Sequence, residues 1–495
     1  MRRRFITSIA VASALALAAT AVALALTGPF TVSAASPVAS CNVPAAGGTN
    51  YPNTEVEPFT AVNPTTVGTT KVNVIGVYQQ DRWSNGGAHA LMSAASFDGG
   101  QTWSRTALPF NTCVGGGLSY ERASDPWVSI GPDGIAYTVS ISFNLSNNDN
   151  AVAAMRSTNG GKTWDHLSLL KVDNDQNQFF NDKESVTADP TRNATAYAVW
   201  DRLVGPANNP AVEAHNFFAF TGPTWFSKTT DGGKTWSTAQ IIVPTGQNQQ
   251  TIANQIVVAP DGTVYDFFDL ILGTGPNAGP MSIAPHGLNV AFIKSTDGGD
   301  TWSAPQVVDS IESSSVSDPN TGQPLRTADF NPDPAIDPVT GQLYVVWQDS
   351  RFTGGHFDEV ALSSSTNGGA SWSAPIQVNT NTPSNRPGFT PAIHVSSDGT
   401  VGVSFYDFRN LTTETATLPT DYWFVSSTNH GASFDSEVHI AGPFDMLTAP
   451  NAGGFFVGDY EGIDTAATVF HPFFVAANSG NTSNRTDAFT TTVSP

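Results

Sequence analysis

An eight-residue pattern that occurs six times along the chain is the feature that most restricts its fold. The pattern is Ser or Thr, any residue, Asp or Asn, Gly or His, Gly, any residue, Thr or Ser, and a closing Trp or Phe. The six copies begin at Ser96, Ser157, Thr229, Ser295, Ser365 and Ser427. Successive copies start 61 to 72 residues apart, which is enough chain for one small antiparallel sheet with its loops. The repeat therefore predicts a series of similar sheets.

Each copy has the composition of a tight turn between two strands. In the first copy, the side chain of Asp98 can accept hydrogen bonds from backbone amides, and Gly99 and Gly100 allow positive φ angles. The closing Trp103 is expected to pack against the sheet. We therefore assign these octets to structure rather than to chemistry.

Short apolar segments around each copy supply the strands. In the fifth unit these segments are Pro334 to Asp337, Leu343 to Trp347, Val360 to Leu362 and, after the octet, Ala374 to Val378. The chain of 495 residues contains 44 Gly and 33 Pro and is 40% hydrophobic, which excludes a mainly helical protein and a disordered one. An all-β chain built from four-stranded units is predicted.

The octets resemble the Asp boxes of sialidase-like β-propellers, and the resemblance covers most of the chain. It implies a propeller of four-stranded blades with a box between the third and fourth strand of each blade. After the sixth box, the segments Gly458 to Asp464, Thr468 to Ala476 and Asp487 to Val493 predict three more strands. We expect residues 42 to 48 to add a fourth strand and close the ring, because closure removes exposed sheet edges. Seven blades are favoured, and six are the alternative if the tail only caps the ring.

The N-terminus has the pattern of a targeting segment. Three arginines at positions 2 to 4 precede an apolar run from Ile6 to Leu26, and the small residues Val32-Ser33-Ala34 follow. We predict a signal peptide over residues 1–35, with an uncleaved membrane anchor as the alternative, and a single propeller domain over residues 36–495. In an exported protein, Cys41 and Cys113 are expected to form a disulfide; two buried free thiols are the alternative.

The charge of the chain narrows the choice of partners. The formal net charge of −21 disfavours nucleic acids and anionic lipid surfaces. The nine histidines are scattered, and no nucleotide-binding glycine motif is present, so neither a metal nor a cofactor is expected. We expect a monomer with a carbohydrate ligand and no membrane contact beyond the signal segment.

Arginines gather at one face of the predicted propeller, where second strands end and first strands begin; we call this face the mouth. They are Arg82, Arg122, Arg202, Arg326, Arg351, Arg386 and Arg409. A concentration of arginine in an acidic chain favours an anionic or polyhydroxylated ligand. Four of these arginines follow an aspartate at a strand end, a pattern that is equally typical of repeated salt bridges between blades.

The resemblance to sialidases also implies a set of site residues: an arginine clamp for the substrate carboxylate, a tyrosine nucleophile polarised by a glutamate, and an acid/base aspartate. On this basis the predicted catalytic residues are Tyr460, Glu184 and Asp125, with Glu461 as a second candidate for the base. The predicted substrate-binding residues are Arg82, Arg122, Arg351, Arg386 and Arg409.

The sequence departs from the family in two places. The family's Arg-Ile-Pro motif is absent, with Asn385-Arg386-Pro387 as the nearest string, and no acid lies between Asp81 and Asp98. Two functions therefore remain open. The first is a secreted sialidase-like glycoside hydrolase acting on acidic glycans, and the alternative is a non-catalytic propeller that binds glycans or proteins at the cell surface.

Overall fold

The computed structural model describes residues 25–174, 178–205, 221–273, 287–380 and 386–495. Within these ranges, regular structure consists of β-strands and three short 3-10 turns, η1 (Pro64–Thr66), η3 (Arg351–Thr353) and η4 (Met446–Thr448). No helix in the described ranges is long and apolar enough to cross a membrane. The predicted all-β class is confirmed.

Antiparallel pairing arranges the described strands in groups of four, each named here by its innermost strand. The β2 group consists of β2 (Glu55–Val62), β3 (Val74–Arg82), β4 (Ala88–Ser96) and β5 (Ser104–Leu108), and the β6 group of β6 (Arg122–Ile130), β7 (Ala136–Phe143), β8 (Asn150–Ser157) and β9 (Asp165–Asp173). The β10 group consists of β10 (Phe179–Ala188), β11 (Ala196–Val204), β13 (Thr224–Thr229) and β14 (Gln240–Val243). The β15 group consists of β15 (Gln249–Val258), β16 (Val264–Leu272), β17 (Leu288–Ser295) and β18 (Gln306–Ile311). The short β12 (Thr221–Gly222) pairs with both β11 and β15.

Three further groups follow the same order. The β19 group consists of β19 (Asp333–Ile336), β20 (Leu343–Asp349), β21 (Glu359–Ser365) and β22 (Ile376–Gln377). The β23 group consists of β23 (Gly388–Val395), β24 (Val401–Asp407), β25 (Pro419–Ser427) and β26 (Val438–Asp445). The β27 group consists of β27 (Gly462–Ala466), β28 (Val469–Ala477), β29 (Thr486–Ser494) and β1 (Ala25–Thr31).

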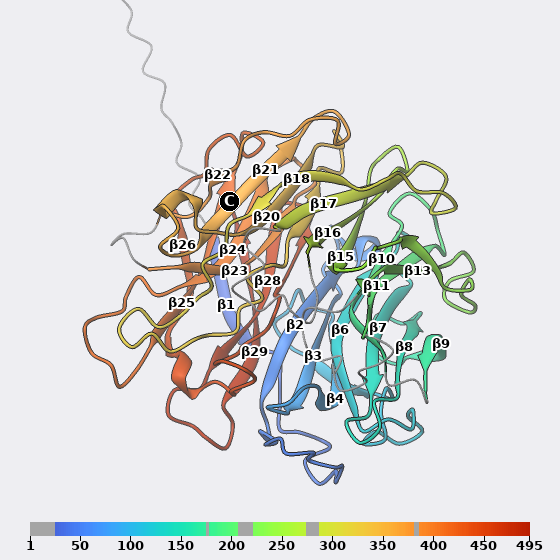
Figure 1. Cartoon of the computed structure of the whole chain (residues 1–495), viewed down its shortest axis with the longest axis horizontal. Helices are drawn as coiled ribbons and strands as arrows, with labels where there is room; N and C mark the ends of the chain where they lie inside the picture. Colours follow the sequence, from blue (N-terminus) through green and yellow to red (C-terminus); the bar gives the residue numbers. More distant parts are fainter. Residues whose placement is uncertain (1–24, 175–177, 206–220, 274–286, 381–385) are drawn as a thin grey trace, which may run out of the picture.

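The innermost strands contact one another in a cyclic order. Contacts run from β2 to β6, β10, β15, β19, β23 and β27, and β27 returns to β2, so the groups surround a common axis (Figure 1). Buried apolar clusters lie between neighbouring groups; one of them joins Val139 and Trp200, from β7 and β11. The chain thus folds as a β-propeller, as predicted. The count of seven blades stays a prediction, which this cyclic order supports.

All six octets lie where the resemblance places them, between the third and fourth strands of their groups. In the first box, Asp98 Oδ1 accepts hydrogen bonds from the amides of Gln101 and Thr102 at 3.1 and 2.9 Å. The hydroxyl of Ser96 accepts a hydrogen bond from the Gly100 amide at 2.8 Å. Both box glycines have positive φ, 72° and 92°. The boxes are therefore self-contained turns, as predicted.

The second glycine of a box also lets neighbouring groups approach. At Gly369, where φ is +82°, a Cβ atom would lie 2.4 Å from the ring of Phe292 in the preceding group. Any larger residue would have to displace this ring, which belongs to the packed core. The box therefore positions one blade against the next as well as turning the chain.

The strand that completes the β27 group lies earlier in the chain than predicted. Residues 42 to 48 form no strand; instead β1 pairs with β29, with Phe30 opposite Thr490 and Thr31 opposite Phe489. Figure 1 shows β1 in blue beside the red β29. The sequence analysis missed β1 because an apolar strand at this position has the same composition as the end of a leader. β1 lies within the segment 1–35 that was assigned to a signal peptide.

The predicted disulfide is present between Cys41 and Cys113, whose Cα atoms are 5.5 Å apart. It connects the segment after β1 to the loop between β5 and β6. Both cysteines pack against the largest apolar cluster. The bond therefore ties the N-terminal segment to the β2 group.

Candidate active site

A bulge near the mouth interrupts most of the innermost strands. The pairing register shifts between Val56 and Phe59, and the same irregularity occurs in β6, β10, β15 and β23. The bulges contain residues in the left-handed region, Glu57, Asp125, Lys183, Ala253 and Thr390. A bulge redirects a side chain and bends its strand. It therefore gives each of these strands one position with a distinct orientation close to the axis.

Three of these bulged strands, and the segment just before β27, each contribute one charged side chain to a buried cluster. The ammonium of Lys183 lies 2.5 Å from Asp459 Oδ2, 3.2 Å from Asp125 Oδ2 and 3.8 Å from Glu57 Oε1. Each of the four residues is at most 6% exposed. We call Glu57, Asp125, Lys183 and Asp459 the mouth cluster. It holds three carboxyl groups around a single ammonium group.

Arginines extend the mouth cluster on one side. Arg326 Nε donates to Asp459 Oδ1 at 2.9 Å, and a second guanidinium nitrogen contacts the other oxygen of the same carboxylate. The guanidinium of Arg326 lies 4.5 Å from the ring centre of Phe456, and that of Arg82 lies 5.0 Å from the same ring. Two cations therefore lie against one aromatic ring near the cluster.

Arg82 differs from Arg326 in having no carboxylate partner within the described residues. It is 2% exposed, and its Nη1 donates to Gln79 Oε1 at 2.7 Å, while its Nε has no hydrogen-bond partner in the described ranges. Burial lowers the pKa of Arg82; the charge of Glu57 raises it in part, and the positive charge of Arg326 lowers it further. An unpaired buried guanidinium is a favourable place for an anion to bind.

Electrostatics sets the protonation of the mouth cluster. Burial raises the pKa of Asp459 and Asp125, but the adjacent cations lower it by more, so both carboxyls have pKa values below the ordinary range. Burial lowers the pKa of the Lys183 ammonium, but the facing carboxylates raise it above its ordinary value. Asp125 and Asp459 are therefore anionic and Lys183 is cationic at neutral pH.

Glu184 has the opposite protonation. Burial raises its pKa well above the ordinary value, and the charge of Asp125 raises it further. Its carboxyl is 2% exposed and receives no hydrogen bond from another side chain of the described residues. Glu184 therefore holds its proton at neutral pH, within the field of an ionised neighbour.

The position of β7 beside Glu184 differs from the matching positions of other groups. In β11, Asp201 accepts a hydrogen bond from the Ala253 amide of the next group at 2.9 Å, and in β20 Gln348 accepts one from Thr390 at 2.8 Å. The matching position of β7 is Ile141, which lies beside Glu184 and has no polar side-chain atom. No side chain at this position of β7 can therefore accept a hydrogen bond from the next group, as Asp201 and Gln348 do.

Tyr460 directly follows Asp459 of the mouth cluster and is partly exposed. Its hydroxyl donates to the carbonyl oxygen of Pro126 at 3.2 Å, and its ring centre lies 5.0 Å from that of Trp127. The ammonium of Lys183 lies 5.9 Å from the centre of the tyrosine ring. Burial and the nearby charges of Glu57 and Asp125 raise the pKa of the phenol well above its ordinary value. The phenol therefore stays protonated until a base accepts its proton.

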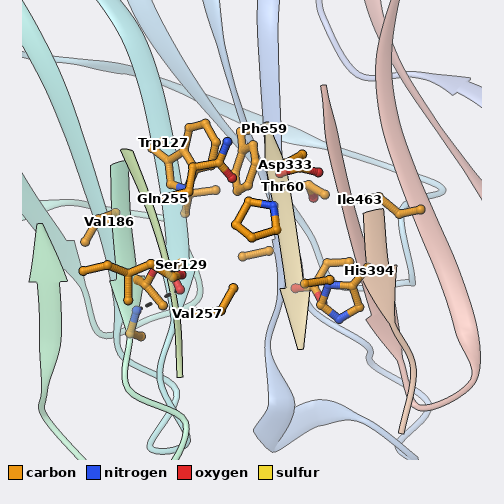
Figure 2. A pocket seen from close by; sticks show the side chains of 18 of the residues that line it. Phe59, Thr60, Trp127, Ser129, Val186, Gln255, Val257, Asp333, His394 and Ile463 are labelled. Atoms are coloured by element: carbon orange, nitrogen blue, oxygen red, sulfur yellow. Dashed lines mark hydrogen bonds and ion pairs between the residues drawn. The ribbon is translucent and has the colours of Figure 1, made fainter. Parts of the chain in front are cut away.

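A cavity of about 240 Å³ follows the axis from the level of the aromatic residues. Figure 2 shows Phe59 and Trp127 close together at one end, with Val186, Val257 and Ile463 around the wall. Phe59 and Trp127 stack with ring centres 3.6 Å apart. Most of the wall is apolar.

Glu461 lies in the wall of this cavity, two residues after Asp459 of the mouth cluster. Its Oε1 accepts the hydroxyl of Tyr406 at 2.6 Å. Burial raises the pKa of Glu461 well above its ordinary value, although the hydrogen bond from Tyr406 lowers it. A carboxyl committed to Tyr406 is poorly suited to act as the base for its neighbour Tyr460.

The structure brings four of the predicted site residues together. In addition to burial, the charges of Asp125 and Glu184 raise the pKa of Tyr460, the charge of Asp125 raises the pKa of Glu184, and Arg82 lies within the field of Asp125. These residues come from four different groups or their connecting segments. Tyr460, Glu184, Asp125 and Arg82 thus form the candidate site.

The other predicted arginines make contacts that tie strands together. Arg351 binds Asp349 at 2.8 Å and Asp309 at 3.2 Å, and Arg409 binds both Asp407 and Glu437. Arg386 donates to the carbonyl of Leu411 at 3.1 Å. The pair of Arg351 with Asp309 joins neighbouring groups, as the interpretation of repeated salt bridges implies, whereas Arg409 binds carboxylates of its own group.

Arg122 holds the N-terminal segment. Its guanidinium lies 3.9 Å from the Trp83 ring centre and donates to the carbonyl oxygens of Gly86 and Pro44, both at 2.8 Å. Burial lowers the pKa of Arg122 to about 10. Its donors are directed at main-chain oxygens rather than at the mouth cluster.

Sequence reasoning did not single out Lys183, Glu57 or Asp459 as site residues. One signal could have found them: Glu57, Asp125 and Asp459 each precede by two residues a side chain that lines the cavity, and Lys183 occupies the bulge position that corresponds to Asp125. A lysine at a position that is acidic in three neighbouring units indicates an ion cluster. The described residues contain no group of three or more His, Cys, Asp or Glu that could hold a metal ion.

Comparisons with known proteins give matches among solved structures. An alpha-L-arabinanase of Penicillium chrysogenum complexed with arabinobiose matches with 10% identity and a TM-score of 0.46, over 94% of this chain and 98% of that one. A Hadza microbial sialidase matches with 14% identity and a TM-score of 0.47, over 86% and 74%. A sialidase of Streptococcus pneumoniae matches with 9% identity and a TM-score of 0.47, over 90% and 94%. No protein-family model and no curated protein sequence matches the chain.

Proposed function

We propose that this protein is a glycoside hydrolase that acts on acidic glycans at the mouth of its propeller. The observation that carries the proposal is the opposite protonation of two neighbouring carboxyls, Asp125 and Glu184, beside the partly exposed Tyr460. Glycoside hydrolysis requires a proton donor for the leaving oxygen and an anionic partner. Two carboxyls whose surroundings separate their pKa values supply this pair.

The geometry favours a different catalytic role for each of the three residues. Tyr460 attacks the anomeric carbon, and its phenolic proton passes to the carboxylate of Asp125, whose neighbour Pro126 already accepts the phenol's hydrogen bond. Glu184 gives its proton to the glycosidic oxygen as the bond to the leaving group breaks. Water then attacks the anomeric carbon and gives a proton to the Glu184 carboxylate, while Asp125 returns its proton to the departing Tyr460 oxygen. Asp125 suits the role of proton acceptor better than Glu184 because Asp125 is the ionised member of the pair.

Arg82 supports an acidic substrate. It is a buried cation without a carboxylate partner in the described part of the chain, and it lies beside the mouth cluster. A substrate carboxylate would give its guanidinium the ion pair that it lacks. Neutral sugars would leave it unpaired.

A second function, glycan binding without catalysis, is favoured by the mouth cluster itself. Lys183 and Arg326 are already neutralised by Asp459, and the Tyr460 hydroxyl donates to a main-chain carbonyl. Such an arrangement could hold a ligand while leaving its glycosidic bonds intact.

One experiment with the full-length protein distinguishes catalysis from binding without catalysis. The wild type is incubated with acidic glycosides and their neutral counterparts; release of sugar is measured, and binding is followed by calorimetry. We expect release from acidic glycosides only, and a loss of turnover by orders of magnitude in Tyr460→Phe at unchanged melting temperature. Binding without release would establish the second function, and neither binding nor release would overturn both.

We also propose that the protein is exported and acts as a monomer outside the cell. The disulfide between Cys41 and Cys113 supports export, because such bonds persist in oxidising compartments. Size-exclusion chromatography with light scattering would test the monomer.

A further inference from the structure

The residues in and just after β1 contact both the last group of the ring, the β27 group, and the first, the β2 group. In β1, Leu26 lies opposite Val493 and Thr27 opposite Thr492. Just after β1, Val32 is fully buried and its amide donates to the Ala488 carbonyl at 2.8 Å. On its other side the Val32 carbonyl accepts a hydrogen bond from Arg105 Nε, in β5, at 2.6 Å. Residues 25 to 33 therefore join the β27 group to the β2 group.

The sequence of β1 fits this position closely. At Gly28, φ is +123°, and a Cβ atom would lie 3.0 Å from Thr491 Oγ1. The same hydroxyl donates to the Thr27 carbonyl at 2.9 Å. Ser33 Oγ donates to Asp487 at 2.7 Å and accepts a hydrogen bond from the Ala488 amide at 3.1 Å. These are the specific contacts of an integral strand.

Removal of residues 1–35 would therefore take away a structural part of the fold. β29 would lose its neighbour along β1 and present unpaired N–H and C=O groups at an open edge, which is a site for aggregation. Arg105 would also lose the acceptor of its Nε, the Val32 carbonyl. A leader that ends near Ala35 is inconsistent with the ring that the structure shows.

The sequence offers another end for the leader. Ala21-Val22-Ala23 is a small-residue pattern of the kind that signal peptidases recognise. The apolar stretch before it, from Ile6 to Thr20, lies at the upper end of the roughly 7–15 residues typical of a leader's apolar region. A cut after Ala23 would leave β1 complete.

We propose that the leader is removed after Ala23, so that the mature chain begins at Leu24 and β1 closes the ring. This proposal rests on the proposed export of the protein but not on its proposed catalysis. It assigns a processing site, and it gives the retained segment a role as the last strand of the last blade.

The first test follows the natural protein. The full-length chain is expressed with its own leader in a secretion-competent host, and the exported product is examined by N-terminal sequencing and intact mass. The expected first residue is Leu24. A product that begins between Ala34 and Ser36, or one that still carries Met1, would overturn the proposal.

The second test is independent of export. Two chains are produced without a leader, one covering residues 24–495 and one covering residues 36–495, and their melting temperatures are compared. The longer chain is expected to melt at the higher temperature. Equal melting temperatures would show that β1 adds nothing to the fold and would overturn the proposal.

A point substitution keeps the test valid if the shorter chain does not fold. Gly28→Ala in the 24–495 chain forces an alanine into positive φ against Thr491, so the melting temperature should fall. The matched control is Gly115→Ala, where φ is not positive and no atom lies within 4 Å of the added Cβ. An unchanged melting temperature for Gly28→Ala would count against an integral β1.

Discussion

Lys183 is the residue on which the mouth cluster depends. Its ammonium faces the carboxyls of Asp459, Asp125 and Glu57, and no other lysine lies among these groups in the described part of the chain. Breaking a buried ion pair by removing one partner leaves an uncompensated charge. The loss of this ammonium should therefore affect stability more than the loss of an exposed one.

The variant Lys183→Met tests this at the residue scale. At pH 7 it should lower the free energy of unfolding by about 3–5 kcal/mol, measured by urea titration. The control is Lys228→Met, which removes a half-exposed pair with Asp300 and should lose no more than about 1 kcal/mol.

The pH dependence of the Lys183 variant has a definite sign. In the wild type, Asp125 and Asp459 have lowered pKa values, so their contribution to stability is present above the ordinary pKa of aspartate and is lost only as the pH falls through the lowered values. Without the ammonium, burial raises the pKa of Asp125, because Lys183 is the main cation that lowers it, whereas Arg326 still keeps the pKa of Asp459 low. Protonation of Asp125 therefore reduces the destabilisation of the variant as the pH falls from 7 toward 4. The difference between variant and wild type should shrink over that range. A difference that is constant with pH would contradict the electrostatic account.

At the scale of elements, the box turns were predictable and β1 was not. A box depends on contacts within eight residues, so its sequence carries all the information that its conformation requires. β1 depends on β29, more than 450 residues away, and nothing local distinguishes a closing strand from the end of a leader. Local patterns therefore predicted the repeating unit, and the closure required the three-dimensional structure.

The box turns make their own prediction. Asp98→Ala removes the acceptor of the Gln101 and Thr102 amides and should lower the free energy of unfolding by about 1–2 kcal/mol. Asp435→Ala, at an exposed position with no side-chain hydrogen bond among those in the described ranges, is the control and should change stability by less than about 0.5 kcal/mol. Turnover per folded molecule should be unchanged in both. A stable but inactive Asp98 variant would show that the boxes take part in chemistry.

At the scale of the whole molecule, the candidate site exists only because the ring closes. Glu57, Asp125, Lys183 and Asp459 are far apart in the chain and meet around one axis. The mouth as a region could be predicted, because strand ends of a repeating unit fall on one face. The partners of each side chain could not be predicted: Arg351 and Arg409 face aspartates of their own strands, whereas Arg82 is left without an ion pair among the described residues.

Turnover of an acidic glycoside by wild type and by Glu184→Gln is the measurement that tests the proposed catalysis most directly. Glutamine has the shape of the protonated acid but cannot give up the proton, so kcat should fall by about 100-fold or more without a loss of thermal stability. Glu359→Gln is the matched control, since Glu359 is also buried and burial raises its pKa to about 8, but it lies in β21, on the third strand of its group. This control should retain wild-type turnover. Equal turnover by Glu184→Gln, or no turnover by the wild type, would contradict the account.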